Sequence, residues 1–265
     1  MKSLTLLSAA LLAGAVPRTA AAQAPLETPA AMAAPAPAAA NCPPVAVDAV
    51  ALPASAAALR AGRPLTVVAF GSSSTEGAGA STPAHAYPAR LEALLRAALP
   101  GRAVRVLNRG IGGQDVGEML ARLDTDVLPD HPQLVVWQAG ANAALRGMSP
   151  DAFRETLTEG LARLRAFGSD VVLMDSQLAP VVLSRPHYPQ LAAALRDVAA
   201  ARSVPVFSRA ELMRAWEALG TSPLDMLHAD GLHHNDRGYA CVAQALATSV
   251  LRGLRAAVPM VASGR

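Results

Sequence analysis

Apolar residues occur along this chain in two patterns, which alternate from about residue 55 to residue 254. Short uninterrupted apolar runs are typical of buried strands, whereas longer stretches with one apolar face predict amphipathic helices. The predicted strands are Leu65–Phe70, Val104–Leu107, Leu134–Gln138, Val171–Met174 and Val204–Phe207. The predicted helices are a short turn at Ser55–Arg60, then Ala84–Ala98, Val116–Leu123, Pro150–Phe167, Tyr188–Ala201, Ala210–Leu219 and Asp236–Leu254. This alternation predicts an α/β fold, a doubly wound five-stranded parallel sheet with helices on both faces.

The first 44 residues follow neither pattern. Lys2 precedes an apolar core, Leu4–Val16, and three alanines end at Ala22. These features predict a signal peptide over residues 1–22, and its apolar core is too short to anchor the chain in a bilayer. Residues 23–44 are rich in Ala and Pro and are predicted to form a linker. We therefore expect one folded domain over residues 45–258, in a periplasmic or secreted protein without stable membrane insertion.

Charge and composition exclude several classes of function. Lys2 is the only lysine, so the processed protein has no residue for a Schiff base and no P-loop lysine. Removal of residues 1–22 takes away two of the 23 basic residues, Lys2 and Arg18, so that 21 face 20 acidic ones. No basic cluster stands out, and we predict no binding of nucleic acid.

The two cysteines, Cys42 and Cys241, lie near opposite ends of the predicted domain. In an exported protein a pair of cysteines indicates a disulfide more often than a metal site. We therefore predict that Cys42 and Cys241 form one disulfide, which would join the end of the linker to the last helix.

Residues that could take part in catalysis follow the predicted strands. Ser72–Ser74 follow the first strand, and a glycine-rich turn, Asn108–Asp115, follows the second. Gly140–Asn142 follow the third strand, and Asp230–His233 precede the last helix. Sites in such sheets form beyond the carboxyl ends of the strands, so we expect all four segments to meet at one edge. Together they offer a hydroxyl nucleophile, an imidazole base, a carboxylate and oxyanion donors, which are the groups that acyl transfer requires.

These segments resemble the four sequence blocks of the SGNH (GDSL-type) hydrolases, and the resemblance covers Leu65 to Leu254. It implies a flavodoxin-like fold and an esterase that needs no cofactor and no metal. Ser73 would be the nucleophile, because it lies two residues after Gly71 and at the start of the next helix. Asp230 and His233 would complete the triad, and the oxyanion would be held by the N–H groups of Ser73 and Gly113 and by the side chain of Asn142.

Two positions depart from the pattern of these hydrolases. Ser72 stands between the glycine and the nucleophile, where the first block usually has Asp, and Ala143 follows Asn142 where many members have Asp. Neither change removes a member of the triad. We expect Ser72 to replace the Asp by supporting the turn through a hydrogen bond, and the ester remains undefined.

Several functions are compatible with these residues. Hydrolysis of short acyl esters, such as acetyl groups on a small molecule or a glycan, is the leading hypothesis, because an aromatic content of 3% leaves few stacking platforms for a long glycan. A thioesterase and a lysophospholipase are alternatives on the same fold. A metal-dependent hydrolase could use His228, Asp230, His233 and His234, and a non-catalytic binding module is the remaining alternative. The oligomeric state is not predicted.

Overall fold

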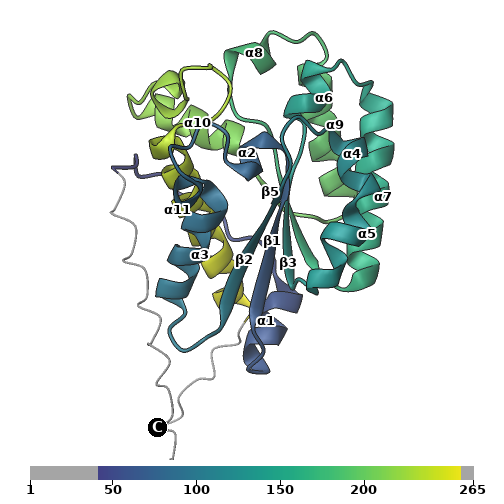
Figure 1. Cartoon of the computed structure of the whole chain (residues 1–265), viewed down its shortest axis with the longest axis vertical. Coiled ribbons are helices and arrows are strands. Elements are labelled where there is room, and N and C mark those ends of the chain that lie inside the picture. Colours follow the sequence, from purple (N-terminus) through teal and green to yellow (C-terminus); the bar gives the residue numbers. More distant parts are fainter. Residues whose placement is uncertain (1–40, 258–265) are drawn as a thin grey trace, which may run out of the picture. The chain divides into compact units, whose positions relative to one another are not determined.

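The computed structural model describes residues 41–257, and Figure 1 shows a parallel sheet at its centre. The strands are β1 (Leu65–Gly71), β2 (Val104–Gly110), β3 (Leu134–Gln138), β4 (Asp170–Met174) and β5 (Val206–Phe207). They lie in the order β2-β1-β3-β4-β5, with every adjacent pair parallel. This order confirms the predicted doubly wound sheet. The predicted signal peptide and the linker up to residue 40 lie outside the described residues.

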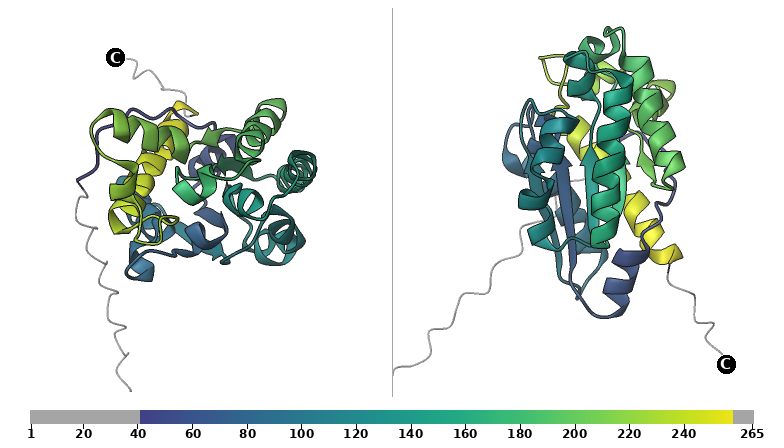
Figure 2. Two further views of the ribbon diagram at one scale, coloured as in Figure 1. Left: turned by 90° about the horizontal axis from the view of Figure 1, so that it is seen from above. Right: turned by 90° about the vertical axis from the view of Figure 1, so that its right-hand side faces the viewer.

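Helices cover both faces of this sheet. The α-helices are α1 (Pro53–Arg60), α2 (Ser73–Glu76), α3 (Tyr87–Ala98), α4 (Val116–Ala121), α5 (Leu123–Asp126), α6 (Ala141–Leu145), α7 (Pro150–Phe167), α8 (Pro180–Leu183), α9 (Tyr188–Ala201), α10 (Arg209–Ala218) and α11 (Asp236–Ala256). Three 3₁₀ turns are η1 (Pro83–His85), η2 (Leu128–Asp130) and η3 (Pro223–Met226). Figures 1 and 2 show α3, α10 and α11 on one face and α4, α5, α7 and α9 on the other.

The central strands are buried along their whole length because both faces of the sheet are covered. Every residue of β3 and β4 is buried, and so is every residue of β1 except Thr66. Phe70 and Trp137 pack together in this core, with ring centroids 5.8 Å apart. Uninterrupted apolar runs are what a parallel sheet covered on both faces requires, which is why the runs predicted the strands.

The structure moves the ends of several predicted elements: β5 begins at Val206 rather than Val204, and the helix predicted over Val116–Leu123 ends at Ala121, with α5 starting at Leu123. The largest changes are in β2 and α3. Strand β2 continues through Asn108 to Gly110, because its backbone pairs with β1 as far as Gly71 opposite Gly110. Residues 108–110 were expected to belong to the glycine-rich turn after this strand. Helix α3 begins at Tyr87 rather than Ala84, because Ala86 has an extended backbone (φ −65°, ψ 150°) that separates the helix from η1.

Side-chain caps fix where several helices begin. Ser149 accepts a hydrogen bond from the N–H of Ala152 at 3.2 Å and starts α7, and Pro150 occupies its first turn. Asp115 and Glu118 form a capping box at α4. Asn235 caps α11 by accepting from the N–H of Gly238 at 2.9 Å. Each cap satisfies N–H groups that the first turn of a helix leaves without partners.

Helix α11, of 21 residues, closes the fold by packing against α3. One side of the helix is buried, including Tyr239, Leu246 and Val250. Within residues 41–257, no helix is both long and apolar enough to cross a membrane.

A disulfide joins Cys42 to Cys241 in the second turn of α11. The two cysteines are 199 positions apart in the chain, so the bond closes nearly all of the folded domain into one loop. Arg237 strengthens the same junction by donating from Nε and Nη2 to the carbonyl of Asn41, at 3.3 and 3.2 Å. The structure thus ties the segment before the domain to its last helix.

We expect removal of this disulfide to lower the free energy of unfolding by about 5 kcal/mol, the loop-entropy value for a loop of this size. The measurement is denaturant unfolding of the oxidised protein and of the Cys42→Ser/Cys241→Ala variant. Adding a reductant should destabilise the parent protein and leave the variant unchanged. Two thiols that react in the unreduced protein would contradict the prediction.

Candidate active site

Ser73 lies at the carboxyl edge of the sheet, where β1 ends and α2 begins. Gly71 is the last residue of β1, and the carbonyl of Ser72 accepts hydrogen bonds from the N–H groups of Thr75 and Glu76, at 2.9 Å each. This turn leaves Ser73 partly exposed, whereas Ser72 and Ser74 are each only 2% exposed. Of the three adjacent serines, Ser73 is the one that the backbone presents to solvent.

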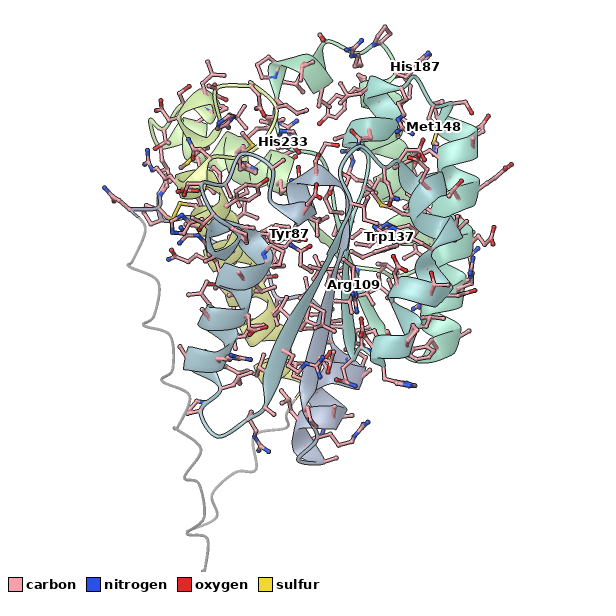
Figure 3. All side chains as sticks on the ribbon, in the orientation of Figure 1. Tyr87, Arg109, Trp137, Met148, His187 and His233 are labelled. Atoms are coloured by element: carbon pink, nitrogen blue, oxygen red, sulfur yellow. A yellow bond between two sulfur atoms is a disulfide. The ribbon has the colours of Figure 1, made fainter. Side chains whose placement is uncertain are left out.

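His233 faces the hydroxyl group of Ser73. Its Nε2 lies 2.8 Å from Ser73 Oγ, and its Nδ1 lies 2.7 Å from Asp230 Oδ2. A proton on Nδ1 can therefore be donated to Asp230, which leaves Nε2 free to accept the proton of the Ser73 hydroxyl. The side chain of His233 is 14% exposed, and Figure 3 shows it beyond the carboxyl ends of the strands. The structure brings together Ser73, His233 and Asp230 in the order that the sequence predicted.

Asp230 also organises the turn that carries His233. Its Oδ1 accepts hydrogen bonds from the N–H groups of Leu232 (2.9 Å) and His233 (3.0 Å), so one carboxylate holds both the backbone and the imidazole. Partial burial acts to raise the pKa of Asp230, but the hydrogen bonds from the His233 side chain and the two N–H groups outweigh it and hold that pKa well below its usual range. The carboxylate therefore stays ionised where an ordinary aspartate begins to protonate.

The glycine-rich turn after β2 lies beside Ser73. A Cβ atom built on Gly112 would lie 3.9 Å from the Cβ of Ser73, so this turn passes close to the proposed nucleophile. Gly113 follows with φ of +78°, a left-handed conformation that favours glycine. Arg146 donates from Nη2 to the carbonyl of Gly113 at 2.7 Å, and pairs with Asp115 and Glu118 through Nη1. Those contacts fix the turn from its outer side.

Asn142 approaches the same turn from α6. Its Nδ2 donates to the carbonyl of Gln114 at 2.8 Å, the residue after Gly113. An amide nitrogen carries two protons, so this bond leaves one of them for another acceptor. The structure thus places Asn142 against the turn that contains Gly113.

The four residues of the metal alternative do not all converge: the Nδ1 atoms of His228 and His233 lie 3.5 and 2.7 Å from Asp230 Oδ2, but His234 has other partners. His234 is buried, its Nδ1 lies 3.0 Å from the carbonyl of Met226, and its ring meets the edge of Tyr239. Burial, and next the positive charge of Arg209, lower the pKa of His234 to about 3, so it remains neutral. Within the described part of the chain, no group of three or more His, Cys, Asp or Glu is placed to hold a metal ion. This arrangement favours the serine mechanism over the metal-dependent one.

Two buried glutamines support the site and were not anticipated. Gln177 follows β4 and donates from Nε2 to the carbonyl of Leu232 at 2.6 Å, which anchors the turn of Asp230 and His233. Gln138, the last residue of β3, accepts hydrogen bonds from Ser72. The predicted bond of Ser72 is therefore present. A polar residue at the end of an apolar strand was the available signal, but the sequence alone does not name its partner.

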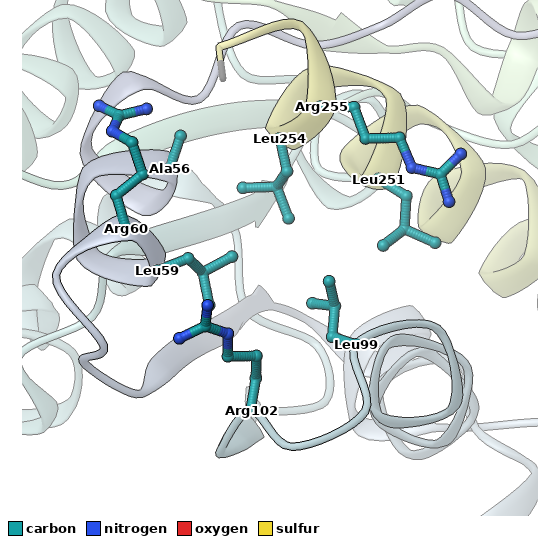
Figure 4. Close-up of a pocket in the computed structure, with 8 residues that line it drawn as sticks. All are labelled: Ala56, Leu59, Arg60, Leu99, Arg102, Leu251, Leu254 and Arg255. Carbon is teal, nitrogen blue, oxygen red and sulfur yellow. The ribbon is translucent and has the colours of Figure 1, made fainter. Parts of the chain in front are cut away.

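A separate cavity of about 600 Å³ lies among α1, the end of α11 and the segment after α3 (Figure 4). Its lining residues are Ala56, Leu59, Arg60, Leu99, Arg102, Leu251, Leu254 and Arg255. Because α1 precedes β1 and Leu99 precedes β2, this cavity lies toward the amino ends of the strands. It is thus remote from Ser73 and contributes nothing to the chemistry of the triad.

Comparisons with known proteins place the chain among lipase-like proteins. A family model described as the non-GDSL lipase-like family matches residues 39–256. Esterase TesA of Pseudomonas aeruginosa is 38% identical over 85 residues, which are 32% of this chain and 42% of that protein. An arylesterase of Vibrio mimicus is 36% identical over 81 residues, 30% of this chain and 40% of that protein. The chain therefore spans less than half the length of either curated relative.

Solved structures share the same architecture. The crystal structure of a lipase/acylhydrolase from Enterococcus faecalis superimposes with a TM-score of 0.58 and 28% sequence identity. The superposition covers 69% of this chain and 94% of that one, so nearly the whole of that protein corresponds to the domain described here.

Proposed function

The chain belongs to the non-GDSL lipase-like family, and from this premise we propose that it is a serine-dependent carboxylic ester hydrolase. One observation carries the proposal: Ser73 Oγ, His233 and Asp230 form a continuous hydrogen-bonded chain with links of 2.8 and 2.7 Å. A serine hydroxyl is a weak nucleophile at neutral pH, and a histidine oriented by a carboxylate is what activates it.

The reaction follows from these contacts. Ser73 Oγ attacks the ester carbonyl carbon while His233 Nε2 takes the hydroxyl proton, and Asp230 stabilises the imidazolium. His233 then gives that proton to the leaving alcohol oxygen, which leaves the acyl group on Ser73. A water molecule attacks the acyl-enzyme, and His233 transfers the water's proton to Ser73 Oγ. The carboxylic acid leaves, and the enzyme is restored.

The negative charge of each tetrahedral intermediate needs preorganised donors. In the proposed site these are the backbone N–H groups of Ser73 and Gly113 and the side-chain amide of Asn142. Arg146 donates to the carbonyl of Gly113 at 2.7 Å, and Asn142 donates to the carbonyl of Gln114 at 2.8 Å. These bonds hold both residues in place. Donors held in advance need no reorganisation during the reaction, and the loss of one such donor typically costs 10²- to 10³-fold in kcat.

We assign short acyl esters as the substrates, acetyl groups on a small molecule or a glycan first among them. The aromatic content of 3% supports a compact substrate over a long stacked glycan. We further infer that the protein acts in the periplasm or outside the cell. The apolar segment that precedes residue 22 and the disulfide between Cys42 and Cys241 support this location.

The test is turnover of p-nitrophenyl esters of increasing acyl chain length by the purified protein, with Ser73→Ala as the inactive control. We expect kcat/KM to be highest for acetate and to fall as the chain lengthens. A maximum at long chains would favour the lysophospholipase alternative, and faster cleavage of the matched thioester would favour a thioesterase. If no ester is turned over, the remaining hypothesis is that the protein is a non-catalytic binding module.

We expect chelation with EDTA to leave the rate of ester hydrolysis unchanged, because Ser73 and His233 supply both nucleophile and base. The measurement compares initial rates before and after dialysis against the chelator. A loss that zinc restores would instead assign the reaction to the cluster of His228, Asp230, His233 and His234.

A further inference from the structure

The side-chain carbonyl of Gln138 is a shared acceptor beneath the nucleophile turn. Its Oε1 lies 2.9 Å from the N–H of Ser72, 3.1 Å from Ser72 Oγ and 3.2 Å from Thr75 Oγ1. Gln138, Ser72 and Thr75 are 1%, 2% and 0% exposed. A single oxygen therefore joins the residue before Ser73 to the residue two positions after it, in an environment without competing solvent.

The turn leaves room for this amide because Gly71 has no side chain. A Cβ atom on Gly71 would lie 2.7 Å from Gln138 Oε1, and it would also clash with the hydroxyl of Thr75. Strand geometry places the amide there: Phe70 pairs with Trp137 at the end of the β1–β3 ladder, and Gln138 is the next residue of β3. The last residue of β3 thus occupies the point where β1 turns into α2.

The buried hydroxyl of Tyr87 reaches this acceptor through Thr75. Tyr87 OH lies 3.2 Å from Thr75 Oγ1, and Tyr87 is completely buried. Burial raises the pKa of Tyr87 to about 12, which keeps the phenol protonated and able to donate. Tyr87 can then donate to Thr75, and Thr75 to Gln138. Such a chain of hydrogen bonds strengthens each member and leaves α2 one orientation.

The donor and acceptor character of these groups has to match. Gln138 Oε1 only accepts, so the side chain at position 72 must donate, and the hydroxyl of Ser72 does so. A carboxylate at position 72 would face Gln138 Oε1, so that two acceptors would meet in a buried space. Such an unpaired contact costs free energy of folding. Ser72 and Gln138 are therefore a matched pair, and the serine in place of the usual Asp has a physical partner in this chain.

We propose that Gln138 is a positioning residue for Ser73: its carbonyl oxygen, held by Ser72 and Thr75, sets the place of the nucleophile relative to His233 Nε2. This inference rests on the proposed esterase function. A misplacement of a reacting atom by about 1 Å can cost 10²-fold in rate. Ser73 Oγ and His233 Nε2 are 2.8 Å apart, and a loosened turn would lengthen this distance.

The experiment compares Gln138→Met, Gln138→Glu and Ser72→Ala with the parent protein. Each is measured for kcat and KM with p-nitrophenyl acetate, for the rate of labelling by a fluorophosphonate, and for thermal unfolding. We expect Gln138→Met to lower kcat about 100-fold at unchanged KM, with labelling slowed in the same ratio. Gln138→Glu retains an acceptor oxygen and should recover kcat to within about tenfold. Ser72→Ala removes one of the three donors and should lower kcat about tenfold.

The matched control is Gln133→Met, at the residue just before β3. Gln133 Oε1 also accepts from a β1 backbone group, the N–H of Thr66 at 2.8 Å, but it lies far from Ser73 along the strand. We expect this variant to lose stability and to keep its kcat. The comparison separates loss of a hydrogen bond between β1 and a glutamine side chain from loss of positioning.

Two sets of results would overturn the inference. One is a Gln138→Met protein whose kcat and labelling rate equal those of the parent, or fall no more than those of Gln133→Met. The other applies if Gln138→Met does not fold: Ser72→Ala with unchanged kcat and labelling would then reject the role of this acceptor. If the parent protein neither turns over esters nor takes the label, the proposed function itself fails.

Discussion

Replacement of Ser73 by alanine is expected to reduce kcat for ester hydrolysis on the order of 10⁶-fold, the size of loss found when a triad nucleophile is removed. The hydroxyl of Ser73 lies 2.8 Å from His233 Nε2 and is the group that would carry the acyl intermediate. Neither neighbouring serine can take its place: Ser72 donates to Gln138, and Ser74 is buried. KM should change little, because the lost group is needed mainly in the transition state.

The identity of the nucleophile can be read directly from a covalent label. After treatment with a fluorophosphonate, tandem mass spectrometry of the peptide that contains residues 72–74 should place the adduct on Ser73. Ser74→Ala is the matched control, since it removes a neighbouring hydroxyl that points into the fold, and it should keep both labelling and turnover. An adduct on Ser72 or Ser74, or full activity in Ser73→Ala, would contradict the assignment.

The sequence predicted the architecture because its strands are buried on both faces. Runs such as Leu65–Phe70 and Leu134–Gln138 have no polar alternation, and together with the helices between them they indicate a parallel sheet covered on both faces. The resemblance to SGNH-type hydrolases is confirmed by the matching family model and by solved structures of that fold. The prediction that Asp230 and His233 meet a serine after β1 depended on both segments lying at the carboxyl edge.

Other features depend on contacts between residues that are distant in the sequence. Strand β2 extends to Gly110 because β1 supplies hydrogen-bonding partners, which the polar residues 108–110 do not reveal. Gln138 was assigned to a buried strand, but its acceptor role is decided by Ser72 and Thr75, more than 60 positions away. Local propensity has no information on such partners, so supporting residues are harder to predict than the residues that react.

Removal of His233 and removal of the Asp230 charge are expected to differ in size. His233→Ala should lower kcat on the order of 10⁶-fold, because the imidazole moves the proton in every step. Asp230→Asn should cost less, on the order of 10⁴-fold, because the carboxylate orients the imidazole and stabilises its charged form without taking the proton. Both are measured as kcat with p-nitrophenyl acetate at saturating substrate.

Two further variants, the double variant of His233 and Asp230 and a variant of the neighbouring His228, test these roles. His233→Ala/Asp230→Asn should be no slower than His233→Ala alone, because residues that act as a unit do not contribute additively. His228 is half exposed; its Nδ1 accepts from the N–H of Asp230 at 3.4 Å and lies 3.5 Å from Asp230 Oδ2, so it is a neighbour of the carboxylate. His228→Gln should therefore keep kcat within a few-fold. Near-normal turnover in His233→Ala would reject the mechanism, and a large loss in His228→Gln would show that Asp230 serves a second histidine in the reaction.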